Sequence, residues 1–135
     1  MTRSRFATAI NCIDGRVQTP VLDWMKLHLN VDYVDLITEP GPDKALALAT
    51  EATATVFKRV SFSARAHDPV AIAIAGHHDC LANPVTREEH FDQIKEAVRI
   101  IMTWGIRIRT IGLWVNEWNW VDVIHDTEGR YGVVS

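Results

Sequence analysis

The 135-residue sequence is poor in cysteine, with only Cys12 and Cys80. A small secreted scaffold that depends on disulfides carries more cysteine than this. We therefore expect a reduced, cytoplasmic protein, in which two cysteines more often serve a metal or catalysis than a bridge. Neither cysteine has a partner at the CxxC spacing of a zinc ribbon, so that class of structural site is excluded.

The chain also lacks an excess of positive charge and long apolar runs. Its formal net charge is -3, which leaves no electrostatic footprint for nucleic acid. No segment approaches the roughly 18 consecutive apolar residues of a membrane span. The glycine motifs that bind phosphate groups, G-x-G-x-x-G and G-x-x-x-x-G-K-[ST], are both absent. We expect no nucleic-acid and no membrane partner. Hydrophobic residues make up 47% and charged residues 23%, as in an ordinary globular protein, and we expect residues 1–135 to form one domain.

Short apolar runs alternate with helical patterns along the chain. Strands separated by helices of this length form βαβ units. The prediction is therefore an α/β fold, with a mostly parallel central sheet of about four strands flanked by helices, and a C-terminal hairpin or edge strand. The expected strands are 6–11, 33–37, 70–75 and 106–115, and the expected hairpin joins 120–125 to 131–134.

Helix signals lie between these strands. Thr19 is expected as an N-cap because Pro20 follows it at the first helical position. A single helix is expected over 43–64. A capping-box pattern at Thr86 begins the next helix, and Gly105 ends it. The buried stripe of the 43–64 helix is expected to be Ala49, Ala52, Val56, Val60 and Ala64.

Polar side chains follow the first and third expected strands at their carboxyl ends. The first cluster holds Cys12, Asp14 and Arg16, and the second holds His77 and Cys80. Open α/β sheets bind their ligands at this edge. Two thiols and one imidazole are ligands that zinc favours, and three such ligands leave a fourth tetrahedral position free, as in a catalytic site.

Each cluster alone is a weak signal with an ordinary structural interpretation. An isolated cysteine at a strand end is more often a small buried hydrophobe than a ligand. A disulfide between Cys12 and Cys80 is a structural alternative to a metal site. Asp14 and Arg16 alone could form a surface ion pair that contributes little to stability. The occurrence of both clusters at matching strand ends favours metal binding.

The two motifs resemble those of the β-class carbonic anhydrases. That family carries C-x-D-x-R and H-x-x-C on adjacent strands of a parallel sheet, and here they read as residues 12–16 and 77–80. The resemblance extends through the Pro-Gly loop, the buried strand before Gly-His and the closing Asp-Thr-Glu-Gly segment, and covers nearly the whole chain. Leu81 stands where the family usually has glycine, and few residues precede Cys12. The chain therefore resembles a small, divergent branch without the family's N-terminal arm.

This resemblance implies a site and a reaction. Cys12, His77 and Cys80 would bind Zn²⁺, and Asp14 and Arg16 would be catalytic. The implied reaction is the reversible hydration of carbon dioxide to bicarbonate by a zinc-bound hydroxide, oriented by the Asp-Arg dyad. The resemblance also implies a homodimer or a larger homo-oligomer. Two alternatives stay open, namely a CS2 or COS hydrolase that uses the same zinc site and a non-catalytic zinc-binding homologue.

The remaining histidines and the tryptophans have no partner motif. His78 cannot point the same way as His77, and we expect it to face solvent or to lie behind the ligands. The tryptophans near the C-terminus are expected to pack in the core or at a subunit interface, because no basic residues interleave with them. The histidines expected at the surface or in the core are His28, His67, His90 and His125, and the tryptophans are Trp114, Trp118 and Trp120.

Overall fold

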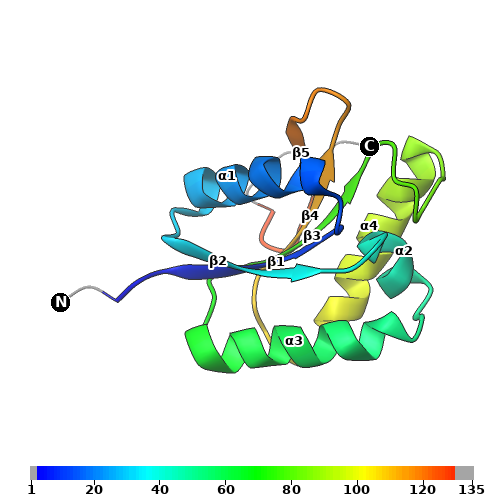
Figure 1. Ribbon diagram of the computed structural model, residues 1–135. Helices are drawn as coiled ribbons and strands as arrows, with labels where there is room; N and C mark the ends of the chain where they lie inside the picture. The colour runs from blue at the N-terminus through cyan, green and yellow to red at the C-terminus, as the bar shows by residue number, and fades with distance from the viewer. Residues whose placement is uncertain (1–2, 130–135) are drawn as a thin grey trace.

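A five-stranded sheet forms the centre of the computed structural model, which describes residues 3–129 (Figure 1). The strand order is β2-β1-β3-β4-β5. Neighbouring strands from β2 to β4 are parallel, and β5 is antiparallel to β4. The predicted α/β class with a mostly parallel sheet is confirmed. The strands are β1 (Phe6–Asn11), β2 (Tyr33–Thr38), β3 (Ile72–His77), β4 (Thr110–Val115) and β5 (Val121–Asp126).

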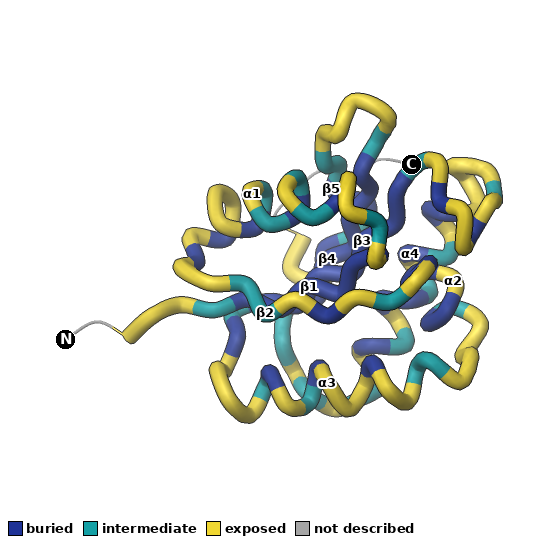
Figure 2. Tube along the Cα trace, viewed as in Figure 1, coloured by how far each residue is buried: buried dark blue, intermediate teal, exposed yellow. Residues whose placement is uncertain are grey.

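Different helices cover the two faces of the sheet (Figure 1). Helix α1 packs on one face, and α3 and α4 pack on the other, where the short α2 lies against α4. Buried residues are concentrated in the sheet between these layers, while residues on the outer faces of the helices are exposed (Figure 2). The helices are α1 (Gln18–Leu29), α2 (Pro42–Ala47), α3 (Ala52–His67) and α4 (Arg87–Met102), with a 3-10 turn, η1 (Gly15–Val17), before α1.

Strand β3 shows why the sheet is covered on both faces. All of its residues are buried, as the unbroken apolar run predicts for a strand within a parallel sheet. Ala73 and Ala75 point into the core beneath α1, whereas Ile72 and Ile74 point into the core beneath α3 and α4. The small side chains of this strand therefore face α1, and its large ones face α3 and α4.

The expectation of one helix over 43–64 was wrong. The chain leaves the helical path between α2 and α3, and Ala49 has a φ of 50° in the left-handed region. The hydroxyls of Thr50 and Thr53 both donate to the carbonyl of Ala45, at 3.2 and 2.9 Å, which satisfies the end of α2. Of the expected stripe, Ala49 is exposed, Ala52 and Ala64 are half-buried, and Val56 and Val60 are buried.

Other boundaries differ by a few residues. Helix α1 begins at Gln18, so Thr19 lies inside the helix and the predicted cap there was wrong. The fourth strand begins at Thr110 instead of residue 106, because Gly105 and Arg107 have φ values of 72° and 61° that do not fit a strand. The cap at Thr86 is confirmed, since its hydroxyl accepts the backbone N–H of Glu89 at 3.1 Å.

The antiparallel pair near the C-terminus joins β4 to β5. The expected hairpin instead paired 120–125 with 131–134, and the latter residues lie outside the described part of the chain. The expected strand at 120–125 agrees with β5, and it pairs with β4 across the loop that holds Trp118.

Candidate metal centre

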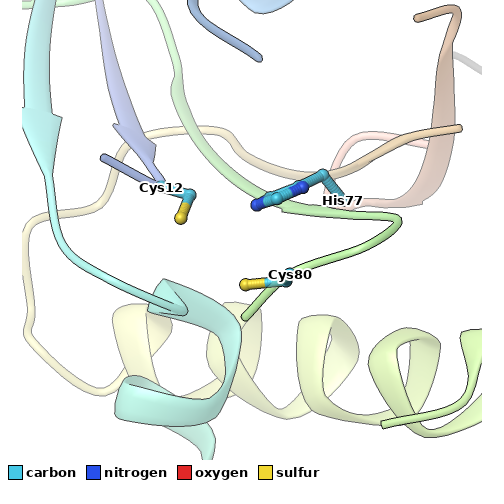
Figure 3. A group of neighbouring side chains, drawn as sticks. All are labelled: Cys12, His77 and Cys80. Atoms are coloured by element: carbon cyan, nitrogen blue, oxygen red, sulfur yellow. The ribbon is translucent and has the colours of Figure 1, made fainter. Parts of the chain in front are cut away.

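The structure brings the three predicted metal ligands together. Cys12 directly follows β1, His77 is the last residue of β3, and Cys80 lies in the turn after β3. Because β1 and β3 are parallel neighbours, their carboxyl ends meet at one edge of the sheet. The three ligand atoms lie within 4.8 Å of one another, all three residues are buried, and their side chains point toward a common space (Figure 3). This cluster could hold a metal ion.

The orientation of the His77 ring suits a metal ligand. Its Nδ1 lies 2.7 Å from the carbonyl oxygen of His78 and donates to it. That bond leaves Nε2 with the free lone pair, and Nε2 is one of two buried side-chain polar atoms in residues 3–129 without a hydrogen-bond partner. Histidine ligands in metal sites commonly donate their other N–H to a backbone carbonyl. His78 itself is half-buried and contributes this carbonyl.

The two thiols lie close enough to shift each other's ionisation. The neighbouring Cys80 thiol lowers the pKa of Cys12 to about 4, opposed by burial and helped by His77. The neighbouring Cys12, together with burial, raises the pKa of Cys80. Burial disfavours protonated His77, but the neighbouring Cys12 sulfur and the His78 carbonyl raise its pKa overall. Both cysteines are free thiols, so the disulfide alternative is absent from the structure.

Asp14 and Arg16 form a two-pronged ion pair beside this cluster. Arg16 Nη2 lies 2.6 Å from Asp14 Oδ2, and Nε lies 3.0 Å from Oδ1. The Arg16 side chain and backbone both donate to the Asp14 carboxylate and hold its pKa well below the usual range. Such a fork fixes the orientation of a carboxylate as well as its charge.

Arg16 binds a second carboxylate, that of Asp79, which the sequence analysis did not predict. Arg16 Nη1 lies 3.1 Å from Asp79 Oδ2, and Nη2 also donates to the Asp79 carbonyl at 3.1 Å. Asp79 has a φ of 52°, a conformation that aspartate tolerates better than most residues. Arg16 therefore joins the first motif to the turn between His77 and Cys80. The signal was an acidic residue within the H-x-x-C motif.

Two amide side chains hold the segment that carries Cys12 and Asp14. The backbone N–H of Cys12 donates to Asn11 Oδ1 at 3.1 Å. Gln18 Nε2 donates to the carbonyls of Cys12 and Asp14, at 2.7 and 3.0 Å. These bonds satisfy the backbone between β1 and α1 and keep both side chains directed at the sheet edge. Sequence reasoning missed Asn11 and Gln18 because isolated amides carry no motif.

A small, mostly apolar cavity opens at the cluster. Its volume is about 220 Å³. Ile13 and Leu81 at this cavity are 64% and 93% exposed, so the cavity reaches the molecular surface. Its lining suits a small molecule that carries no charge. The lining consists of Cys12, Ile13, Asp14, Pro40, His77, Cys80, Leu81 and Ala82.

The other histidines and the tryptophans of residues 3–129 are not part of this cluster. His28 bonds the carbonyl of Trp24, and His67 and His90 each bond an aspartate. Trp114 is buried in the core. The expected core position is therefore confirmed for Trp114, whereas Trp118 and Trp120 are 68% and 72% exposed. Among residues 3–129 no helix is both long and apolar enough for a membrane span.

Comparisons with known proteins identify the relatives of this chain. The model of a family described as "Putative carbonic anhydrase" matches residues 2–125. A β-carbonic anhydrase isoform from Trichomonas vaginalis superposes with a TM-score of 0.58 at 15% identity, over 93% of this chain and 88% of that one. Tetrameric β-carbonic anhydrases from Sordaria macrospora match with a TM-score of 0.58 at 12% identity, over 93% and 84%. These two likenesses show the fold. No curated protein sequence matches the chain.

Proposed function

The chain belongs to the "Putative carbonic anhydrase" family, and from this premise we propose that it catalyses the zinc-dependent, reversible hydration of carbon dioxide to bicarbonate. The observation that carries the proposal is the convergence of Cys12, His77 and Cys80, with ligand atoms within 4.8 Å of one another, at a cavity that Asp14 also lines.

Zinc fits the donors present. Two sulfurs and one imidazole nitrogen are among its preferred ligands, and catalytic zinc sites keep three protein ligands with a fourth position open. His77 Nε2 is buried and has no other partner in the described chain, which is costly unless a ligand is bound there.

The dyad would prepare water for reaction. When bound, zinc makes water ionise near neutral pH. Asp14 accepts a hydrogen bond from the reacting oxygen and so directs a lone pair of that oxygen toward the substrate carbon. Arg16 keeps Asp14 ionised and oriented through its two-pronged bond. Arg16 is thus a positioning residue, and the role of Asp14 depends on it.

The cavity lining matches a neutral substrate and an anionic product. Ile13, Pro40, Leu81 and Ala82 provide apolar surface, which accepts carbon dioxide without offering it a competing charge. Asp14 is the charged carboxylate of this lining. Its negative charge disfavours retention of bicarbonate, so the lining favours release of the product.

We also propose that the chain forms a homo-oligomer. Among residues 3–129 no strand pairs with the outer edge of β2, whose Tyr33 and Leu36 are 55% and 40% exposed. Free edges of this kind are usually covered. The Sordaria macrospora relatives are tetrameric. Sedimentation equilibrium at micromolar concentration should give a multiple of 15.2 kDa, and a monomer mass would refute this proposal.

The test compares substrates on zinc-loaded protein. Stopped-flow hydration of carbon dioxide should exceed the buffer rate, and Asp14→Asn should lower it while zinc remains bound. Hydrolysis of CS2 or COS without carbon dioxide hydration would instead identify a hydrolase that uses the same site. Bound zinc with no turnover of any of the three would show a non-catalytic homologue and refute the proposal.

A further inference from the structure

A buried aspartate-histidine pair lies behind the metal centre, and the proposed function makes no use of it. Asp43 Oδ2 lies 2.6 Å from His90 Nδ1. The two side chains are 1% and 3% exposed. Buried carboxylates of this kind are retained only with full hydrogen bonding. The pair joins the first turn of α2 to the first turn of α4.

Asn83 connects this pair to the turn that carries Cys80. Its Nδ2 donates to Asp43 Oδ1 at 3.1 Å and to Gln93 Oε1 at 2.6 Å. The backbone N–H of Asn83 donates to the Cys80 carbonyl at 3.2 Å. Asn83 is 1% exposed. The position of the Cys80 turn is therefore coupled to the Asp43 carboxylate through one buried side chain.

The loop before α2 also lies against the turn that carries Cys80. A Cβ on Gly41 would lie 3.2 Å from the Asn83 Cβ, so the two loops are in close contact. In Figure 3, α2 begins beside the space where the ligand side chains meet.

The Asp43 carboxylate also packs against the strand that carries His77. A Cβ on Gly76 would lie only 2.7 Å from Asp43 Oδ2. The absence of a side chain at Gly76 therefore allows Asp43 to lie against the backbone directly before His77. One carboxylate is thus bonded to the turn that carries Cys80 and packs against the strand that carries His77.

We propose that Asp43 and His90 are positioning residues that set metal affinity, because they hold the α2 loop, the Cys80 turn and the backbone before His77 against one another and so fix where the ligands lie. This inference rests on the proposed function for the identity of the metal, zinc. Groups that orient metal ligands typically change metal affinity or activity by about 10- to 100-fold when they are removed. His90→Leu removes the donor and leaves Asp43 without its partner, so the two loops are free to shift.

The test measures zinc affinity by competition with a chromophoric chelator, together with the sulfur-to-cobalt absorption band of cobalt-loaded protein. His90→Leu should weaken zinc binding by about 10- to 100-fold and shift the band. His90→Asn places an amide N–H near the former Nδ1 and should restore most of the affinity. The matched control is His67→Leu, because His67 forms a similar 2.7 Å bond to Asp35 that does not reach the metal centre. It should bind zinc like the wild type.

The outcomes separate this inference from the proposed function. Wild-type affinity in folded His90→Leu would overturn the inference alone. Equal weakening in His90→Asn or in the His67 control would also overturn it, because packing or general stability would then explain the loss. If His90→Leu does not fold, Asn83→Ser keeps the pair and cuts its link to the Cys80 turn. Weaker zinc binding in that variant supports the inference, and unchanged binding overturns it. A wild-type protein that binds no zinc would overturn both.

Discussion

Two polar clusters lie at the sheet, and they differ in what their polar atoms contact. Between β2 and α3, Asp35 Oδ2 accepts bonds from Ser63 and from His67, each at 2.7 Å. Its donors and acceptors satisfy one another. At the carboxyl ends of β1 and β3, the metal centre directs three ligand atoms at one space, and His77 Nε2 has no partner among residues 3–129. The polar atoms of the first cluster satisfy one another, whereas the second cluster could hold a metal ion.

The two clusters also differ in the size of the cavity beside them. The cavity at Asp35 and His67 has a volume of about 490 Å³, against about 220 Å³ at the metal centre. The larger cavity is the usual first guess for a binding site. Here the converging side chains of the metal centre indicate the binding site better than cavity size does, because a buried polar atom without a partner is costly in the absence of a bound group.

The largest expected effect comes from removing a ligand. Cys80→Ser should reduce zinc affinity by on the order of 100-fold or more, since it removes a direct bond where loss of an orienting partner already costs up to about 100-fold. Ser63→Ala, in the other cluster, should retain one zinc per chain. Elemental analysis after dialysis measures both variants. Full zinc content in Cys80→Ser would show that the metal binds elsewhere.

A smaller loss is expected from the carboxylate of the dyad. Asp14→Asn should lower kcat/KM for carbon dioxide hydration by about 10- to 100-fold with zinc retained, because a neutral amide accepts the hydrogen bond from the reacting oxygen more weakly than a carboxylate and cannot keep the two-pronged bond to Arg16. Asp35→Asn should leave the rate near that of the wild type. Stopped-flow assays at equal zinc content make the comparison. Equal losses in both variants would remove the distinction between the two clusters.

The pH dependence should separate the zinc centre from the dyad. Arg16 holds the pKa of Asp14 below its usual value. The bond between Arg16 and Asp14 therefore contributes its full stability above the pKa of about 3.9 that Asp14 has in the unfolded chain. This contribution is lost only as the pH falls through the lower pKa of Asp14 in the folded chain. Asp14 thus keeps its charge throughout the assay range. Two thiolates neutralise the zinc charge, so water there should ionise above the value of about 7 for three histidines.

We accordingly expect kcat/KM to rise severalfold between about pH 6.5 and 9.5, as the water that zinc activates ionises. His67→Leu should not change the profile. The assay is stopped-flow hydration at a buffer concentration that does not limit proton removal. A flat or falling profile in the wild type would contradict this description of the site.

The smallest effect on stability or activity is expected from a change in the cluster between β2 and α3. His67 and Asp35 have side chains that are 39% and 26% exposed, and exposed pairs contribute about 1 kcal/mol or less. His67→Leu should therefore lower the free energy of unfolding by no more than about that amount. Urea titration at pH 7 measures the change. A loss of several kcal/mol would show that this cluster is more than a local surface contact.

Sequence patterns predicted the parts of the fold that depend on residues close together in the chain. The strands around Ile10 and Ile74 follow from short apolar runs, and the motifs placed Cys12 and His77 at the ends of β1 and β3. The break between α2 and α3 was missed, because Thr53 reaches back eight residues to the Ala45 carbonyl. Such a bond is not visible in a helical pattern.

The surroundings of the metal centre were harder to predict than its ligands. Asp43 and His90 are 47 residues apart, and Arg16 and Asp79 are 63 apart. Neither pair follows a spacing rule, since each depends on how α2, α4 and the ligand turn meet in space. Short sequence motifs therefore predict the ligands, whereas the residues that hold the ligands in place are determined by tertiary packing.

X-ray absorption at the zinc edge of the metal-loaded protein tests the central claim most directly. With Cys12, His77 and Cys80 as ligands, the spectrum should show two sulfur atoms at about 2.3 Å, one imidazole nitrogen at about 2.0–2.1 Å and one further light atom in the fourth position. A first coordination shell without sulfur would contradict the account.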